Sequence, residues 1–292
     1  MADVLLERHP AALSKLHQLD RRGQLELVSF HWSAQLYLAY PAVDMERSQQ
    51  LLEASWARVG LPVSAVVFNQ EGQFGEGMIR FAARHGRRIV VLPKNLLKYQ
   101  HASAESELSG LFRHEGVDLL WSQSITTAKL QAVWTFFDDG ELLATAEMNP
   151  YAGPLFKRDR ASLEAYEAKL EELEQRGFRI ATITEMVGWA TDNQVPRQPL
   201  PPMLDGTWQP RSTDSMHRWM GARGMYDLAY DSERDNQVLT GNVRAGHALQ
   251  AAEAMVAHAE RQGWLVEGAR RPQLERCWRE LLLAEVSDAS GI

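Results

Sequence analysis

Acidic side chains come shortly after two apolar runs of this sequence. Glu71 follows the run at 63–68 after two polar residues, and Asp138 and Asp139 directly follow the run at 132–137. If these runs are parallel strands, the loops at their carboxyl ends meet on one face. Two carboxylates that flank a glycosidic bond can cleave it, because one attacks the anomeric carbon or activates water while the other protonates the leaving oxygen.

Each of these acids also has an ordinary structural interpretation. A glutamate after a strand often serves as a loop acid or as a charge at a helix N-terminus. This applies to Glu71 and also to Glu185, which follows the run at 178–184. The Asp-Asp-Gly sequence at 138–140 is also a turn signature. The residue types alone therefore leave both interpretations open.

Aromatic side chains lie at the ends of other apolar runs. His31 and Trp32 follow the run at 25–30, and Trp121 ends the run at 117–121. An indole offers a flat apolar face against which a sugar ring can pack, and nine tryptophans are a rich supply for 292 residues. We therefore predict that these three side chains contact a ligand.

Trp208 lies in a stretch with five prolines between residues 196 and 210, which predicts an extended linker or an ordered loop that crosses a surface. One hypothesis folds this loop over the functional face and places Trp208 in a substrate subsite. The other has Trp208 hold the C-terminal helices against the rest of the chain.

Metal and cofactor motifs are missing from the sequence. Its nine histidines form no His-x-His or His-x-x-x-His pair, and the single cysteine, Cys277, allows neither an internal disulfide nor a cysteine-rich metal site. The glycines at 72, 75 and 77 do not have the spacing of a dinucleotide fingerprint. We expect no metal and no cofactor.

Apolar runs and helical stretches alternate along the first two thirds of the chain. The runs at 63–69 and 89–92 are almost continuously apolar, as in strands that are covered on both faces. Strands that alternate with helices predict an α/β fold with a parallel sheet, open or closed into a barrel. We expect strands at 25–31, 63–69, 89–92, 117–121, 132–137 and 178–184, and helices at 44–59, 76–85, 103–113 and 159–176.

The composition changes after residue 195. Beyond the prolines, apolar residues recur at helical spacing, Gly263 suits a helix end, and Pro272 suits the first turn of another helix. We predict an α/β domain at 1–195, a linker or loop at 196–212, and a helical region at 213–292.

The overall charge excludes some classes of partner. The formal net charge is −7, whereas nucleic-acid binders usually carry a basic surplus. No apolar run approaches the roughly 18 residues of a membrane helix. Residues 1–16 carry charges and a proline where a signal peptide needs an apolar core. We expect a cytoplasmic protein that binds neither nucleic acid nor membrane.

Residues 9–98 resemble part of glycoside hydrolase family 57. The likeness is carried by residues 23–27 (GQLEL), 40–41 (YP), 60–62 (GLP) and 70–74 (QEGQF). Further along, residues 137–141 (FDDGE) are similar to the Asp-Gly-Glu motif of that family.

The resemblance implies a function. Glu71 would be the nucleophile and Asp139 the general acid/base, with Asp138 as the second candidate for that role and as a substrate-binding residue. The family acts on α-glucans with retention and without a cofactor, as glycosidases or glucanotransferases. The partner would be an oligo- or polysaccharide. Retention predicts that the two carboxyl groups lie roughly 5–5.5 Å apart.

The family fold is a (β/α)7 barrel followed by a helical region. The run at 25–31 matches the third strand of that barrel, and the family's His-Gln-Pro motif has no counterpart here. We therefore expect an incomplete or rearranged barrel. The run at 178–184 could help to close it, a second subunit in a homo- or hetero-oligomer could complete it, or the gene product could begin earlier.

Two other functions are compatible with parts of this pattern. A non-catalytic member of the family could serve as a carbohydrate-binding or scaffold subunit, and this alternative stays open. A polysaccharide deacetylase-like hydrolase is disfavoured, because that chemistry needs an Asp/His-His metal site and the sequence has no such histidine pair.

Overall fold

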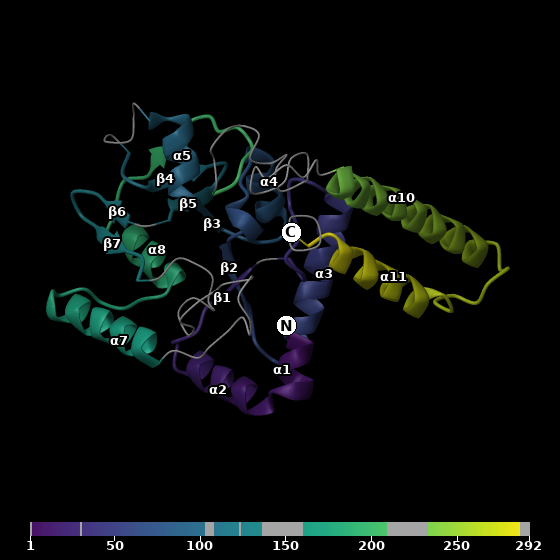
Figure 1. The fold of residues 1–292 in the computed structure, drawn as a ribbon, viewed down its shortest axis with the longest axis horizontal. Helices are drawn as coiled ribbons and strands as arrows, with labels where there is room; N and C mark the ends of the chain where they lie inside the picture. Colours follow the sequence, from purple (N-terminus) through teal and green to yellow (C-terminus); the bar gives the residue numbers. More distant parts are fainter. Residues whose placement is uncertain are drawn as a thin grey trace.

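A mixed α/β fold with a largely parallel sheet is seen in the computed structural model, which describes residues 2–29, 31–102, 108–122, 124–135, 160–208 and 233–286 (Figure 1). The six-stranded sheet has the order β1-β2-β3-β5-β4-β8. The neighbours in β1-β2-β3-β5 are parallel, so the carboxyl ends of these four strands lie at one edge.

Helices connect the parallel strands, as the alternating pattern predicts. The sheet and its crossover helices are β1 (Leu27–Ser29), α3 (Ala42–Arg58), β2 (Val63–Val67), α4 (Glu76–Arg84), β3 (Ile89–Leu92), α5 (Lys94–Gln100) and β5 (Val117–Trp121). Strands β3 and β5 have the expected bounds, and every residue in them is buried. This burial removes both faces of the two strands from water, which explains why all of their residues except Asp118 are apolar.

The helix expected at 103–113 is wrong in its last part. Residues Leu111–His114 form β4, which pairs antiparallel with β5. The turn between the two strands is Glu115-Gly116, and both residues have positive φ values, of 46° and 81°. Leu111 and Phe112 are fully buried, so tertiary packing outweighs the helical spacing of the apolar residues. Residues 103–107 lie outside the described part.

The strand expected at 178–184 is also wrong. Helix α8 (Ile183–Asp192) begins inside it, and Thr182 with Glu185 forms a capping box at the helix N-terminus. The Glu26 carboxylate accepts the N–H of Ile183 at 2.8 Å and so satisfies another free donor of the first turn. A Thr-x-x-Glu sequence favours a helix start over a strand. This segment therefore adds no strand to the sheet, and Glu185 is a helix cap.

The chain after β5 adds an edge strand to the sheet, a separate hairpin and a helix. The proline-rich stretch contributes β8, which pairs parallel to β4, and β6 and β7 form a separate antiparallel hairpin. Helix α7 joins that hairpin through Thr135, whose carbonyl accepts a hydrogen bond from Lys169 Nζ at 2.6 Å. The bounds are β6 (Ser124–Thr126), β7 (Gln131–Val133), α7 (Arg160–Gln175) and β8 (Gln198–Pro199).

Helices at both ends of the described chain pack near α3. Helices α10 and α11 lie side by side (Figure 1), and α11 contacts α3. Pro272 lies in the first turn of α11, as predicted, and the buried face of this helix consists of Trp278, Leu281 and Leu282. None of the described helices has the length and apolar composition needed to cross a membrane. The bounds are α1 (Ala2–Arg8), α2 (Pro10–Arg21), α10 (Glu233–Arg261) and α11 (Arg271–Ala284).

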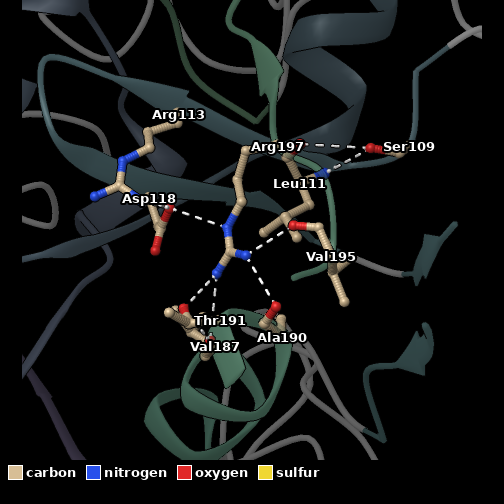
Figure 2. A network of polar contacts seen from close by, with 9 residues as sticks. All are labelled: Ser109, Leu111, Arg113, Asp118, Val187, Ala190, Thr191, Val195 and Arg197. Atoms are coloured by element: carbon tan, nitrogen blue, oxygen red, sulfur yellow. Dashed lines mark hydrogen bonds and ion pairs between the residues drawn. The ribbon is translucent and has the colours of Figure 1, made fainter. Parts of the chain in front are cut away.

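Arg197 fastens α8 to the sheet (Figure 2). Its side chain is only 10% exposed, and Nε lies 3.4 Å from Asp118 Oδ1 of β5. One terminal nitrogen donates to the carbonyls of Ala190 and Val195 at 3.0 and 2.8 Å. The other donates to the Thr191 hydroxyl at 2.7 Å. The guanidinium is thus a second donor to the Ala190 carbonyl, which also accepts the Val195 N–H at 2.8 Å, and its positive charge lies at the C-terminus of α8, where the helix dipole favours a cation.

Candidate active site

Glu71 lies at the edge of the sheet where the parallel strands end. It belongs to the loop at residues 69–75, here called the Glu71 loop, which follows β2 and leads into α4. The short 3₁₀ turn η1 (Gln70–Gly72) holds Glu71 in the left-handed region, with φ 55° and ψ 23°. This conformation is costly for a residue with a side chain and is found at functional sites more often than elsewhere.

The Glu71 carboxylate is largely buried, with 9% of the residue exposed. Oε1 accepts a hydrogen bond from Gln70 Nε2 at 3.1 Å. Oε2 accepts one from the indole Nε1 of Trp208 at 3.2 Å. These two bonds orient the carboxylate at the edge of the Trp208 indole.

Trp208 is held against the Glu71 loop by its backbone as well. Its N–H donates to the Glu71 carbonyl at 3.1 Å, and its own carbonyl accepts from Asn95 Nδ2. Two residues before it, Gly206 exchanges two backbone hydrogen bonds with Phe74 at 2.9 and 3.0 Å. The proline-rich stretch therefore folds over the carboxyl end of β2, and the Trp208 ring lies 6.0 Å from the Phe68 ring.

Gly72 allows the close approach of these segments. Its φ is 55°, and a Cβ there would lie 2.8 Å from Trp208 Cβ and 2.9 Å from Pro93 Cγ. A side chain at position 72 would force Trp208 and the start of α5 away from Glu71.

Trp121 lies at the end of β5, with 5% of the residue exposed. Lys94 Nζ sits 4.8 Å from the centre of its ring in a cation–π contact. Gly110 has φ 84°, and a Cβ there would overlap the indole. Trp121 is therefore largely covered by protein, and its contact near the site is the one with Lys94.

His31 follows β1 at the same edge of the sheet but is buried, with 5% exposed. Its ring stacks on Tyr37 at 5.2 Å, and Nδ1 lies 3.1 Å from Gln49 Nε2. Burial and the nearby His85 lower the pKa of His31 to about 4, against a hydrogen bond with Asn69 that raises it. The imidazole is therefore neutral around pH 7 and packs inside the protein.

Trp32 lies on the side of α3 and α11. Its backbone N–H donates to Ser48 Oγ at 2.8 Å, and Arg279 lies 5.7 Å from the ring centre. Of the sequence-predicted site residues that are described, only Trp208 has a direct hydrogen bond to Glu71. Asp138 and Asp139 lie outside the described residues.

Two polar residues of the site were missed by the sequence reasoning. Lys94 and Asn95 begin α5 one residue after the end of β3, and their contacts with Trp121 and Trp208 bring the start of this helix to the site. The rule that polar residues after a buried strand reach the functional edge could have found both of them. Within the described ranges, no three His, Cys, Asp or Glu side chains gather closely enough to hold a metal ion.

Substitutions at Trp208 can distinguish a role in binding substrate from a role in packing. Trp208→Phe removes the indole N–H but keeps a ring against Phe68, and we expect it to cost about 1 kcal/mol of unfolding free energy. Trp208→Ala also removes the ring and is expected to cost about 3 kcal/mol. Thermal unfolding and calorimetric titration with maltoheptaose would measure both effects. Unchanged maltoheptaose affinity in both variants would leave Trp208 with a packing role alone.

The comparisons with known proteins found few similarities. No family model matches the sequence, and no curated protein matches it. Among solved structures, the crystal structure of 4-alpha-glucanotransferase from Thermococcus litoralis is similar over 41% of this chain, with 21% identity and a TM-score of 0.35. The similar region spans 19% of that protein.

Proposed function

We propose that this protein is a carbohydrate-active enzyme that acts on α-glucans by a retaining double displacement. The observation that carries the proposal is the geometry of Glu71, a buried carboxylate in a left-handed turn that accepts a hydrogen bond from the Trp208 indole. The motifs at 70–74 and 137–141, which are similar to those of glycoside hydrolase family 57, support the same assignment.

In this mechanism Glu71 attacks the anomeric carbon and forms a glycosyl–enzyme intermediate. Asp139 protonates the leaving oxygen and then deprotonates water or an acceptor sugar, with Asp138 as the second candidate for this role. Retention requires carboxyl groups about 5–5.5 Å apart, so Asp139 is expected at that distance from Glu71. The bonds from Gln70 and Trp208 hold the Glu71 carboxylate in one orientation for the attack.

We also propose how the observed sheet relates to the barrel of this family. The parallel strands β1, β2, β3 and β5 would belong to an incomplete or rearranged (β/α)7 barrel, with residues 1–195 as the catalytic domain. The antiparallel β4 between β5 and β8 supports a rearranged arrangement.

The test is incubation of the purified protein with maltohexaose, with the products separated by chain length. Shorter products alone would indicate hydrolysis, and a ladder of shorter and longer chains would indicate transfer. Proton NMR of the first products reports the anomer, and α products are expected. β products would exclude the retaining mechanism.

A second candidate is a non-catalytic carbohydrate-binding subunit. It is favoured by the burial of Glu71, because hydrogen bonds already reach both carboxylate oxygens and 9% of the residue is exposed. Calorimetric binding of maltohexaose without product formation over days would support this function and contradict the enzyme proposal.

A further inference from the structure

A buried carboxyl pair lies where the C-terminal end of α11 meets α3. Asp44 is in the first turn of α3, Glu285 directly follows α11, and each residue is 0% exposed. Gln35, also 0% exposed, donates from Nε2 to Glu285 Oε2 at 2.6 Å. Burial of two carboxyl groups side by side is unfavourable unless at least one of them is neutral or paired.

The two side chains lie close enough for their carboxyl groups to share a hydrogen bond, and each affects the pKa of the other. No N–H or O–H group of another described residue reaches either oxygen of Asp44 or Oε1 of Glu285. A hydrogen bond between two carboxyl groups needs a proton, and here only a carboxylic acid can supply it. Asp44 sits in the first turn of α3, where the helix dipole favours its ionised form, so Glu285 is the donor.

The surroundings favour this assignment. Burial, the charge of Asp44 and the hydrogen bond to Asp44 raise the pKa of Glu285 to about 9, against the bond from Gln35. Burial also raises the pKa of Asp44, while the bond to Glu285 and the nearby His247 of α10 oppose this. Among the described residues Tyr40 also faces the pair, and its hydroxyl accepts a hydrogen bond from Asn242 of α10 at 3.1 Å.

Residues at the C-terminal end of α11, Glu285 among them, bind the segment at residues 33–40. Besides the Gln35 bond, Leu36 N–H donates to the Glu285 carbonyl at 3.3 Å, and Ser33 Oγ donates to the Leu282 carbonyl at 2.7 Å. Gln35 also pairs with Val286 as a β-bridge. The end of α11 is therefore joined to this segment at several points.

The same segment supports the Glu71 loop. Leu38 N–H donates to the side-chain Oε1 of Gln73 at 2.8 Å. Gln73 is 1% exposed and lies two residues after Glu71. A continuous path of hydrogen bonds and backbone thus runs from Glu285 through residues 35–38 to the Glu71 loop.

We propose that a proton held between Glu285 and Asp44 docks α11 onto residues 33–40 and thereby positions the Glu71 loop. Glu285 is a positioning residue in this arrangement. The proposal goes beyond the proposed function, since docking and loop order are measured without a substrate and would stand even if the chain proved non-catalytic.

The direction of the pH effect follows from the raised pKa of Glu285. The folded protein holds this proton up to about pH 9, whereas the unfolded chain releases it near the ordinary value of 4.5. The stabilisation is therefore fully present below about pH 4.5, declines as the pH rises, and is lost above about pH 9.

Glu285→Gln is the decisive variant, because its amide donates to Asp44 and accepts from Gln35 as the protonated acid does, yet cannot ionise. We expect the melting temperature of the variant relative to wild type to rise by about 5 °C or more between pH 5 and pH 9. Glu280→Gln on the exposed side of α11, where the side chain is 72% exposed, is the matched control and should show no such trend. A difference between Glu285→Gln and wild type that stays constant with pH would overturn the proposal.

Hydrogen exchange tests the link to the Glu71 loop. Glu285→Leu removes the bonds to Asp44 and Gln35, and we expect exchange at residues 70–75 to become about tenfold faster, with Glu285→Gln at pH 7 close to wild type. Faster exchange confined to α11 would contradict the positioning role. A rise in the wild-type melting temperature with added Ca²⁺ or Mg²⁺, absent in Glu285→Gln, would show that a cation occupies the place assigned to the proton.

Discussion

Glu71→Gln is expected to lower kcat/KM for maltohexaose by about 10³-fold or more, because the amide cannot attack the anomeric carbon. The substitution keeps the size of the side chain, and its amide oxygen can still accept the indole N–H of Trp208. The fold should therefore persist, with a melting temperature close to that of wild type. Product formation from maltohexaose and thermal unfolding are measured on the same preparation.

Glu115→Gln is the matched control for Glu71→Gln. Glu115 also has a left-handed backbone, with φ 46°, but its carboxylate lies in the exposed turn after β4 and pairs with Arg80. Its substitution should leave activity unchanged. Near wild-type activity of Glu71→Gln would remove Glu71 from the nucleophile role.

Chemical rescue of Glu71→Ala with azide is a second test of Glu71 as the nucleophile. In Glu71→Ala the nucleophile is removed and a space opens on the face of the sugar that Glu71 would attack. With α-glucosyl fluoride as substrate, azide should displace fluoride from that face and give β-glucosyl azide. Formation of the α-azide or the absence of any azide product, with activity retained in the wild type, would place the nucleophile elsewhere.

Arg197→Leu is expected to lower the free energy of unfolding by about 3–5 kcal/mol, because it leaves the buried carboxylate of Asp118 without its closest cation and removes the donor to the buried Val195 carbonyl. Asp118 would keep only Arg113, whose Nη1 is 3.8 Å away. The carbonyls of Ala190 and Val195 would lose the bonds shown in Figure 2. Denaturant unfolding at pH 7 measures the loss.

Arg80→Leu is the control for this prediction. Arg80 also pairs with a carboxylate, that of Glu115, but its side chain is 74% exposed. Solvent screens such a pair, so the unfolding free energy should hardly change. Equal losses in Arg80→Leu and Arg197→Leu would contradict the assignment of Arg197 as the buried link between α8 and the sheet.

The sequence by itself determined the parallel core. Strands β3 and β5 are apolar at every position except Asp118 because both of their faces are buried, and this signal is local. The position of Glu71 after β2 follows from the same pattern, since the chain must turn where the apolar run ends. Pro272 likewise marks the start of α11 because its fixed φ suits a first helical turn.

The secondary structure of short segments with mixed sequence signals depends on the residues that pack around them. Residues 111–114 have helical spacing but form β4, because pairing with β5 buries Leu111 and Phe112. Residues 178–184 are rich in strand-forming types, yet a capping box starts α8 within them. A local preference is worth only tenths of a kcal/mol to about 1 kcal/mol per residue, so burial or a helix cap can reverse it.

Contacts between distant parts of the chain were decided by the tertiary structure alone. The indole of Trp208 meets the carboxylate of Glu71 across 137 positions, and the amide of Gln35 meets Glu285 across 250. Periodicity reports which face of an element is buried but carries no information about the partner on that face. The partner is selected by packing and by the need of each buried polar group for a hydrogen bond, which exist only once the chain has folded.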